Sequence, residues 1–258
     1  MKIEQNSFVK ILEINDDDCI TVTGGGGKTS LLFLLMKELT DRGIPSMITT
    51  TTKMWYPDNF GGTMMFLDQF GGEQLSKAIK QCLDLQLFVA AARLSDNKVS
   101  GLSPEMVDSI FENDKYRIIL NEGDGSAGKP AKIYHQGEPV IPQKTNRLFH
   151  LIGCEVWNEP LGRYLHRCPP ELEVQRFNPD WFIKQLLIYA KLVKRFDHAQ
   201  SDLIINKAEG EYFTAACEMA VIAQVFFKAV YIASIQEGWI INSNDVHEEV
   251  RLNPKSEK

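Results

Sequence analysis

The chain has 258 residues and a formal net charge of −6, and 44% of its residues are hydrophobic and 24% charged. This composition is typical of a globular protein. The net negative charge argues against nucleic-acid binding, and no apolar run approaches the roughly 20 residues that a membrane span requires. Five scattered cysteines without a C-x-x-C pair, and an N-terminus without a signal-peptide core, predict reduced thiols and a cytoplasmic location. We expect one domain over 1–258, with 1–18 as a preamble and 253–258 as a frayed tail.

The most informative stretch is a glycine-rich turn between a predicted strand at 19–23 and a predicted helix that ends near 41–43. Glycines let a backbone approach a ligand closely, and the following helix presents free N–H groups and the positive end of its dipole. We therefore predict phosphate binding by Lys28, Ser30 and the glycines Gly24, Gly25, Gly26 and Gly27, with Thr29 as a Mg²⁺ ligand.

The turn departs from the usual phosphate-binding pattern G-x-x-x-x-G-K-[ST], because Val22 stands at its first glycine. The compact form T-G-x-x-G-K-T remains, and it resembles the loop of the Mur ligases as much as a standard Walker A loop. The alternative interpretation is a flexible glycine-rich turn without a ligand.

Short apolar strands then alternate with helices, which predicts βαβ units and a mostly parallel sheet. Strands are predicted at 45–48, 64–67 and 87–92, and helices at 73–82 and 104–112. Thr50 and Thr51 follow the first of these strands, at the sheet edge where open α/β sheets bind ligands. They are candidate binding residues, although threonine also favours strands for its shape alone.

A second group of candidates follows the predicted strand at 116–120. Glu122 and Asp124 stand where one carboxylate can hold Mg²⁺ and another can polarise a nucleophile. The alternative is a plain Asp-Gly turn. Lys129 and Lys132 could neutralise phosphate or an acidic substrate, or could be ordinary surface lysines.

The last third of the chain is predicted as a loop at 136–142, strands at 147–153 and 202–205, helices at 179–196 and 211–227, and a last strand at 229–234. His166 and Arg167 are a candidate anion-binding pair, and they could favour the thiolate of Cys168. Asn206, Lys207 and Glu209 resemble the guanine-reading Asn-Lys-x-Asp element of GTPases. Because Glu209 replaces the aspartate, the choice between ATP and GTP stays open.

Together these blocks resemble the YqeC family, which is linked to selenium-dependent molybdenum hydroxylases. The blocks that carry the resemblance, in chain order, are 22–32, 49–52, 122–126 with 129–130, 138–142, 166–169 and 206–209. The sequence departs from the family's pattern at Gly137, where the family tends to have histidine, and at Glu209, where it tends to have aspartate. The loop, the alternating elements and the resemblance predict an α/β fold, a P-loop NTPase-like three-layer sandwich around a mostly parallel β-sheet.

The leading functional hypothesis is a Mg²⁺-dependent NTP-binding enzyme in which Lys28, Glu122 and Asp124 are catalytic, and Thr29, Glu122 and Asp124 hold the metal. The resemblance implies a role in maturation or insertion of a selenium cofactor, with a molybdenum hydroxylase or a selenium donor protein as partner. Two alternatives stay open. One is a small-molecule kinase or Mur-ligase-like enzyme, and the other is a nucleotide-gated delivery chaperone with negligible turnover.

Overall fold

The computed structural model describes residues 3–113, 116 and 118–246. Within them a nine-stranded sheet runs in the order β14-β13-β12-β10-β1-β8-β2-β5-β4. Every neighbouring pair is parallel except β13 and β14. The strands are β1 (Cys19–Gly24), β2 (Ser46–Thr50), β4 (Thr63–Phe66), β5 (Gln86–Ala90), β8 (Ile118–Glu122), β10 (Arg147–Gly153), β12 (Gln200–Asn206), β13 (Val230–Ser234) and β14 (Trp239–Asn242).

Helices cover both faces of this sheet, as the buried apolar clusters show. One face packs against α1 (Phe8–Ile11) and α2 (Lys28–Asp41), and its core includes Ile20 and Val22 of β1. The other face packs against α4 (Gly72–Gln81), α5 (Pro104–Asn113), α7 (Pro179–Val193) and α8 (Phe213–Ala223). Strands buried on both faces read as continuous apolar runs, which is why the sequence revealed them.

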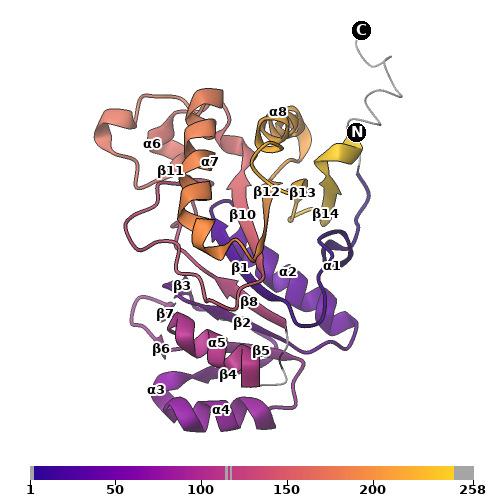
Figure 1. Ribbon diagram of the computed structural model, residues 1–258, viewed down its shortest axis with the longest axis vertical. Coiled ribbons are helices and arrows are strands. Elements are labelled where there is room, and N and C mark those ends of the chain that lie inside the picture. Colours follow the sequence, from indigo (N-terminus) through magenta and orange to yellow (C-terminus); the bar gives the residue numbers. More distant parts are fainter. Residues whose placement is uncertain (1–2, 114–115, 117, 247–258) are drawn as a thin grey trace.

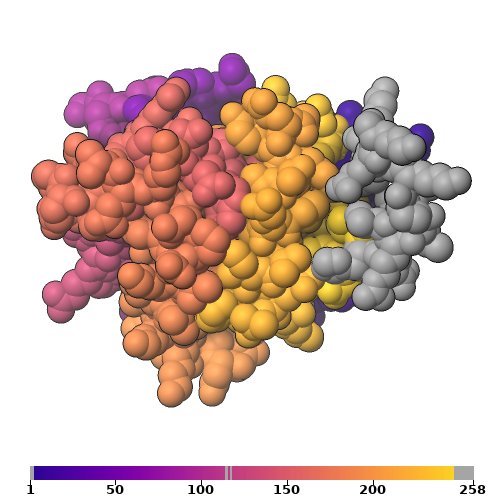
Figure 2. Space-filling model, turned by 90° about the horizontal axis from the view of Figure 1, so that it is seen from above, coloured from indigo at the N-terminus to yellow at the C-terminus, as the bar shows by residue number. Residues whose placement is uncertain are grey.

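Figure 1 shows α7 and α8 toward one end of the sheet and α4 and α5 toward the other. Figure 2 looks onto the first of these ends, where the orange segment around α7 lies beside the yellow-orange segment around α8. The short helices α3 (Leu67–Phe70) and α6 (Leu161–Tyr164) complete the layers. None of the helices in the described part of the chain is both long and apolar enough to cross a bilayer.

Several predicted elements are wrong at their ends or are incomplete. The preamble contains α1, whose Phe8 is fully buried and whose first N–H groups bind the carboxylate of Glu38 on α2. β14 follows the strand that was predicted to be the last. The predicted helix over 179–196 becomes a 3-10 turn after Val193, and the predicted tail at 253–258 lies outside the described residues.

Two small sheets were not predicted. β3 (Met54–Trp55), β7 (Lys98–Ser100) and β6 (Ala92–Arg93) form an antiparallel sheet, while β9 (Ala131–Lys132) pairs in parallel with β11 (Leu165–His166). Strands of two or three residues are too short to show a periodic pattern. The second pairing matters most, because it brings the segment after Asp124 next to the His166–Arg167 segment.

Candidate functional site

The glycine-rich loop connects β1 to α2 at the carboxyl edge of the sheet. The backbone is left-handed at Gly24 and Gly26, with φ of 90° and 78°, which favours glycine. A Cβ on Gly24 would lie 2.1 Å from the carbonyl oxygen of Leu151, and one on Gly25 would lie 2.4 Å from that of Lys129. The two glycines are therefore required for the loop to lie against β10 and the segment before β9.

The N–H groups of the loop divide into two sets. The N–H groups of Gly24, Gly25 and Gly26 donate to Asp124 Oδ2, Leu151 O and Lys129 O, at 2.8, 2.9 and 3.1 Å. The first N–H groups of α2 have no acceptor within the helix, and its N-cap residue Gly27 supplies no side-chain cap. An anion would therefore be bound from Gly27 onward, while the first three amides hold the loop in place.

Lys28 and Thr29 begin α2 and contact the two predicted carboxylates. The ammonium of Lys28 lies 3.2 Å from Asp124 Oδ1 and 3.8 Å from Glu122 Oε1, and donates to the carbonyl of Gly24 at 2.7 Å. The hydroxyl of Thr29 donates to Glu122 Oε2 at 2.7 Å. The structure thus brings together the four side chains that the sequence predicted to share one site, although Lys28 and Thr29 lie more than ninety residues before Glu122 and Asp124 in the chain.

The two carboxylates have different surroundings. Burial raises the pKa of Glu122, and the nearby charge of Lys28 and the Thr29 hydrogen bond offset this only in part. Glu122 accepts the hydrogen bond of the Thr29 hydroxyl through Oε2, and such a hydroxyl–carboxylate pair fits Mg²⁺, which takes few protein oxygens and keeps several waters. Asp124 is fully buried, with Oδ2 bound to Gly24 N–H and Oδ1 beside Lys28. Its predicted roles as a direct metal ligand and as a base are not favoured, because neither oxygen faces open space.

A chain of charges extends from Asp124 toward the surface. Lys132 lies 3.7 Å from Asp124 Oδ2 and donates to Glu138 Oε2 at 2.7 Å, and Arg167 donates to the same Glu138 oxygen at 2.8 Å. Burial alone would raise the pKa of Glu138, but the hydrogen bond and charge of Lys132, followed by those of Arg167, hold it below its usual value. Lys132 is thus a buried structural cation, and Arg167 is exposed where this row of charged side chains reaches the surface.

A buried aromatic cluster packs against the glycine-rich loop at Gly24. His150 on β10 stacks on Tyr189 of α7 with ring centroids 4.0 Å apart, and its Nδ1 lies 3.3 Å from the hydroxyls of Thr23 and Tyr134. Burial, with the charges of Lys28 and Lys132, lowers the pKa of His150 to about 3. Sequence analysis missed this cluster because its members are far apart in the chain.

The Asn206–Glu209 segment lies directly beside the loop. The side-chain amide of Asn206 donates to Gly26 O at 2.7 Å, and its oxygen accepts from the N–H of Ile235 at 3.0 Å. Lys207 pairs with Glu155, a residue that the sequence did not single out. Glu209 keeps one buried carboxylate oxygen without a hydrogen-bond partner among the described residues.

The other predicted residues lie near the loop but are engaged elsewhere. The Thr50 hydroxyl donates to the carbonyl of Glu122 at 3.0 Å, and the Thr51 hydroxyl donates to that of Val140 at 2.6 Å. Lys129 donates to the carbonyl of Arg163, and Ser30 is exposed on the first turn of α2. The two threonines therefore hold the end of β8 and the loop at 138–142 in place, and no contact with a ligand is needed to explain them.

The structure does not favour the thiolate hypothesis for Cys168. Burial raises the pKa of the Cys168 thiol, and the charges of Glu173 and Glu171 add to the rise. The guanidinium of Arg167 binds Glu138 instead of approaching the sulfur. All five cysteines are free thiols, and no group of three metal-ligating His, Cys, Asp or Glu side chains occurs in the described part of the chain.

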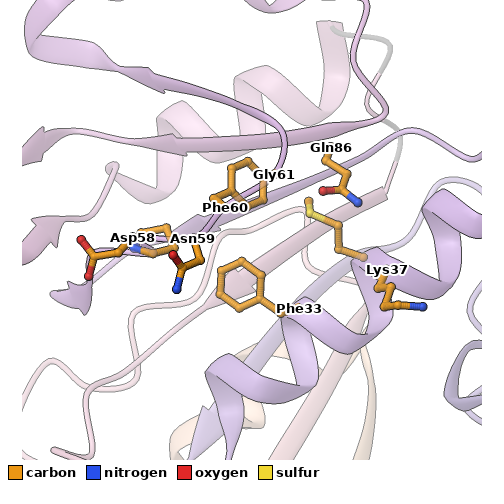
Figure 3. A pocket seen from close by; sticks show the side chains of 9 residues that line it. Phe33, Lys37, Asp58, Asn59, Phe60, Gly61 and Gln86 are labelled. Atoms are coloured by element: carbon orange, nitrogen blue, oxygen red, sulfur yellow. The ribbon is translucent and has the colours of Figure 1, made fainter.

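A separate hollow of about 510 Å³ lies between α2 and the segment 57–61. Figure 3 shows its lining side chains, with the ring of Phe33 on α2 near that of Phe60, at a centroid distance of 6.1 Å. None of the predicted site residues lines this hollow. We therefore locate the candidate site at the glycine loop.

Comparison with known proteins identifies relatives only at the level of sequence. The family model described as YqeC protein matches residues 20–169. The chain is 32% identical over 152 residues to a protein of Escherichia coli (strain K12) named "Uncharacterized protein YqeC". That match covers 56% of this chain and 57% of the relative, so it spans little more than half of either protein. No solved structure matches.

Proposed function

Since the chain belongs to the YqeC family, we propose that it binds a nucleoside triphosphate with Mg²⁺ at the glycine loop, and hydrolyses it or transfers its outer phosphoryl group. The observation that carries the proposal is the contact between Thr29 Oγ1 and Glu122 Oε2 at 2.7 Å, made where α2 begins. It joins a helix N-terminus to a carboxylate at the end of the adjacent strand, as a P-loop NTPase fold requires.

Each residue near the loop has a distinct task in this proposal. The N–H groups from Gly27 onward and the ammonium of Lys28 bind phosphate oxygens. Thr29 and Glu122 hold the metal, which, when bound, neutralises charge on the outer phosphates. Asp124 does not touch the ligand, because it fixes Gly24 and orients Lys28.

Lys28 must change partners when phosphate binds. Its ammonium now contacts the Gly24 carbonyl and two carboxylates, and a phosphate group offers stronger charge-assisted hydrogen bonds than a carbonyl does. Metal bound at Glu122 would also offset that carboxylate's charge. The exchange releases Lys28 toward the phosphate while its pairing with Asp124 keeps the side chain in the loop.

In the cell, we assign this activity to the maturation or insertion of a selenium cofactor for a selenium-dependent molybdenum hydroxylase, the role linked to the family. This assignment rests on family membership and predicts a protein partner, either the hydroxylase or a selenium donor. The nucleotide site itself rests on the loop geometry and is independent of the assignment.

The experiment that tests the site is a thermal-shift panel with ATP, GTP, ADP and GDP, each with and without Mg²⁺. A nucleotide at about 100 times its Kd stabilises the fold by about 2.7 kcal/mol. Lys28→Ala should abolish the shift, but it also leaves Glu122 and Asp124 without their shared cation, which costs stability. Thr29→Val keeps that pairing and is the milder second variant. A full shift in both variants would refute the site.

Turnover then separates the three versions of the function. Steady phosphate release by the protein alone indicates an NTPase. Release that depends on one added metabolite indicates a kinase or ligase. Binding without release, with turnover that rises only when the hydroxylase or selenium donor is added, indicates a delivery chaperone.

A further inference from the structure

A buried lysine lies next to the carboxylate that holds Lys28. The side chain of Lys132 is 1% exposed, and its ammonium lies 3.7 Å from Asp124 Oδ2. Lysine is almost never fully buried unless it is paired, so a buried cation at this position needs an explanation. The function proposed above gives Lys132 no task.

Asp124 depends on nearby cations, because its own hydrogen bonds do not satisfy it. The side chain is fully buried, and Oδ1 has no hydrogen-bond partner among the described residues. The ammonium of Lys28 lies 3.2 Å from this oxygen. A buried carboxylate that loses its cation is strongly destabilising. Nucleotide binding creates this problem, because phosphate oxygens then compete with Asp124 for the ammonium of Lys28.

Lys132 is held in turn by groups closer to the surface. It donates to Glu138 Oε2 and to the carbonyl of Gly125, both at 2.7 Å. Arg167 donates to the same oxygen of Glu138 at 2.8 Å. The backbone of Arg167 is left-handed, with φ of 63°, which is uncommon for a residue other than glycine and costs conformational energy. The fold therefore keeps a strained arginine where it shares Glu138 with Lys132.

The charges of this cluster balance both before and after nucleotide binding. Three cations and three carboxylates are linked by ion pairs and hydrogen bonds, namely Lys28, Lys132, Arg167, Glu122, Asp124 and Glu138. In the proposed complex the metal takes Glu122 and the phosphate takes Lys28. Two carboxylates and two cations remain, so the rest of the cluster stays neutral.

We propose that Lys132 is a positioning residue for the nucleotide, because it neutralises Asp124 while the phosphate draws the charge of Lys28. Glu138 pulls Lys132 away from Asp124, and Arg167 weakens this pull because it binds the same carboxylate oxygen. Lys132 and Arg167 thus raise the affinity for nucleotide without touching it. The inference rests on the proposed nucleotide site and explains how Lys28 becomes available there.

A double-mutant cycle between Lys132 and Asp124 tests the proposal. The affinity for ADP with Mg²⁺ is measured by calorimetry in the wild type, Lys132→Met, Asp124→Asn and the double variant. Asparagine can still accept from the N–H of Gly24, but it carries no charge that needs a cation. We expect Lys132→Met to weaken binding roughly 10-fold or more in the wild type and to have little effect in the Asp124→Asn background.

Arg167 offers a milder set of variants, because its side chain is exposed and its replacement leaves the core intact. Arg167→Gln should weaken binding about two- to fivefold, and Arg167→Lys, which keeps the charge, should restore most of the affinity. Arg163→Gln is the matched control. Arg163 is an exposed arginine in the same segment, and its guanidinium lies over the ring of Tyr164. Binding by this control should equal that of the wild type, and a melting curve shows that each variant is folded.

The outcomes separate this inference from the nucleotide site. An equal loss of affinity from Lys132→Met in both backgrounds would overturn the positioning role, because the effect would not pass through Asp124. Full affinity in Lys132→Met, with binding that still requires Lys28, would also overturn it and leave the nucleotide site standing. Absence of nucleotide binding by the wild type would overturn both.

Discussion

Replacement of His150 by phenylalanine should remove a large part of the protein's sensitivity to mild acid. His150 is buried beside Gly24, and this burial, with the charges of Lys28 and Lys132, lowers its pKa from 6.5 to about 3. Between these two pKa values the unfolded chain binds a proton at this residue and the folded chain does not. The free energy of unfolding therefore falls as the pH falls from 6.5 toward 3.

The size of the effect follows from the two pKa values. Between pH 8 and pH 5, a histidine that titrates only in the unfolded state lowers the free energy of unfolding by about 2 kcal/mol. This corresponds to a shift of the urea midpoint of roughly 1 M. Phenylalanine keeps a ring against Tyr189, so the fold should tolerate it at a cost that does not depend on pH.

The assay is urea unfolding at pH 8 and pH 5 for the wild type, His150→Phe and His198→Gln. His198 is exposed, so its replacement should leave the pH dependence unchanged. Subtracting the variant from the wild type removes the contribution of every other titrating group, including buried carboxylates that act in the opposite direction. Parallel pH dependence in the wild type and His150→Phe would refute the buried neutral histidine.

Three further predictions concern the loop and its surroundings. Burial raises the pKa of Glu122, so at pH values above the usual carboxylate pKa the ionised side chain opposes folding. Glu122→Gln should therefore raise the melting temperature at pH 7. The variant should also lose the part of nucleotide stabilisation that depends on Mg²⁺. An unchanged Mg²⁺ effect would contradict the metal assignment. Gly25→Ala should destabilise the protein by about 1–3 kcal/mol, because its Cβ would lie 2.4 Å from Lys129 O. Gly125→Ala is the control, because a Cβ at that position meets open space. Equal melting temperatures for the two variants would count against the packed loop. Cys168 should react with iodoacetamide at pH 7 more slowly than a free thiol, because burial raises its pKa; faster reaction would restore the thiolate hypothesis.

The central sheet could be predicted because its strands are buried on both faces. The runs 147–153 and 202–205 consist mostly of apolar residues, and the structure confirms strands there as β10 and β12. The glycine-rich turn could be predicted for a different reason. Its backbone conformation requires glycine at particular positions, and this requirement is visible in a few consecutive residues. β14 (Trp239–Asn242) was missed although its first three residues favour a strand, because a run of four residues is short and its antiparallel pairing with β13 cannot be seen in the sequence.

The sequence predicted most of the individual residues of the candidate site, but not the contacts between them. Sequence spacing cannot show that Asp124 lies under Gly24, or that Glu138 is shared by Lys132 and Arg167, because such contacts depend on how distant strands align. The pairing of β9 with β11 brings Lys132 and Arg167 together, and a pairing of two-residue strands cannot be predicted from the sequence. His150 carries no signal at all, since a lone histidine in an apolar strand has no recognisable pattern.

The most direct test of the account is the effect of Mg²⁺ on nucleotide affinity in the wild type and in Thr29→Val, with Ser30→Ala as the exposed control. We expect Mg²⁺ to tighten binding in the wild type and in Ser30→Ala, and to have little effect in Thr29→Val, because the hydroxyl that contacts Glu122 is gone. If Mg²⁺ tightened binding equally in all three proteins, the metal would not lie between Thr29 and Glu122, and the proposed site would be wrong.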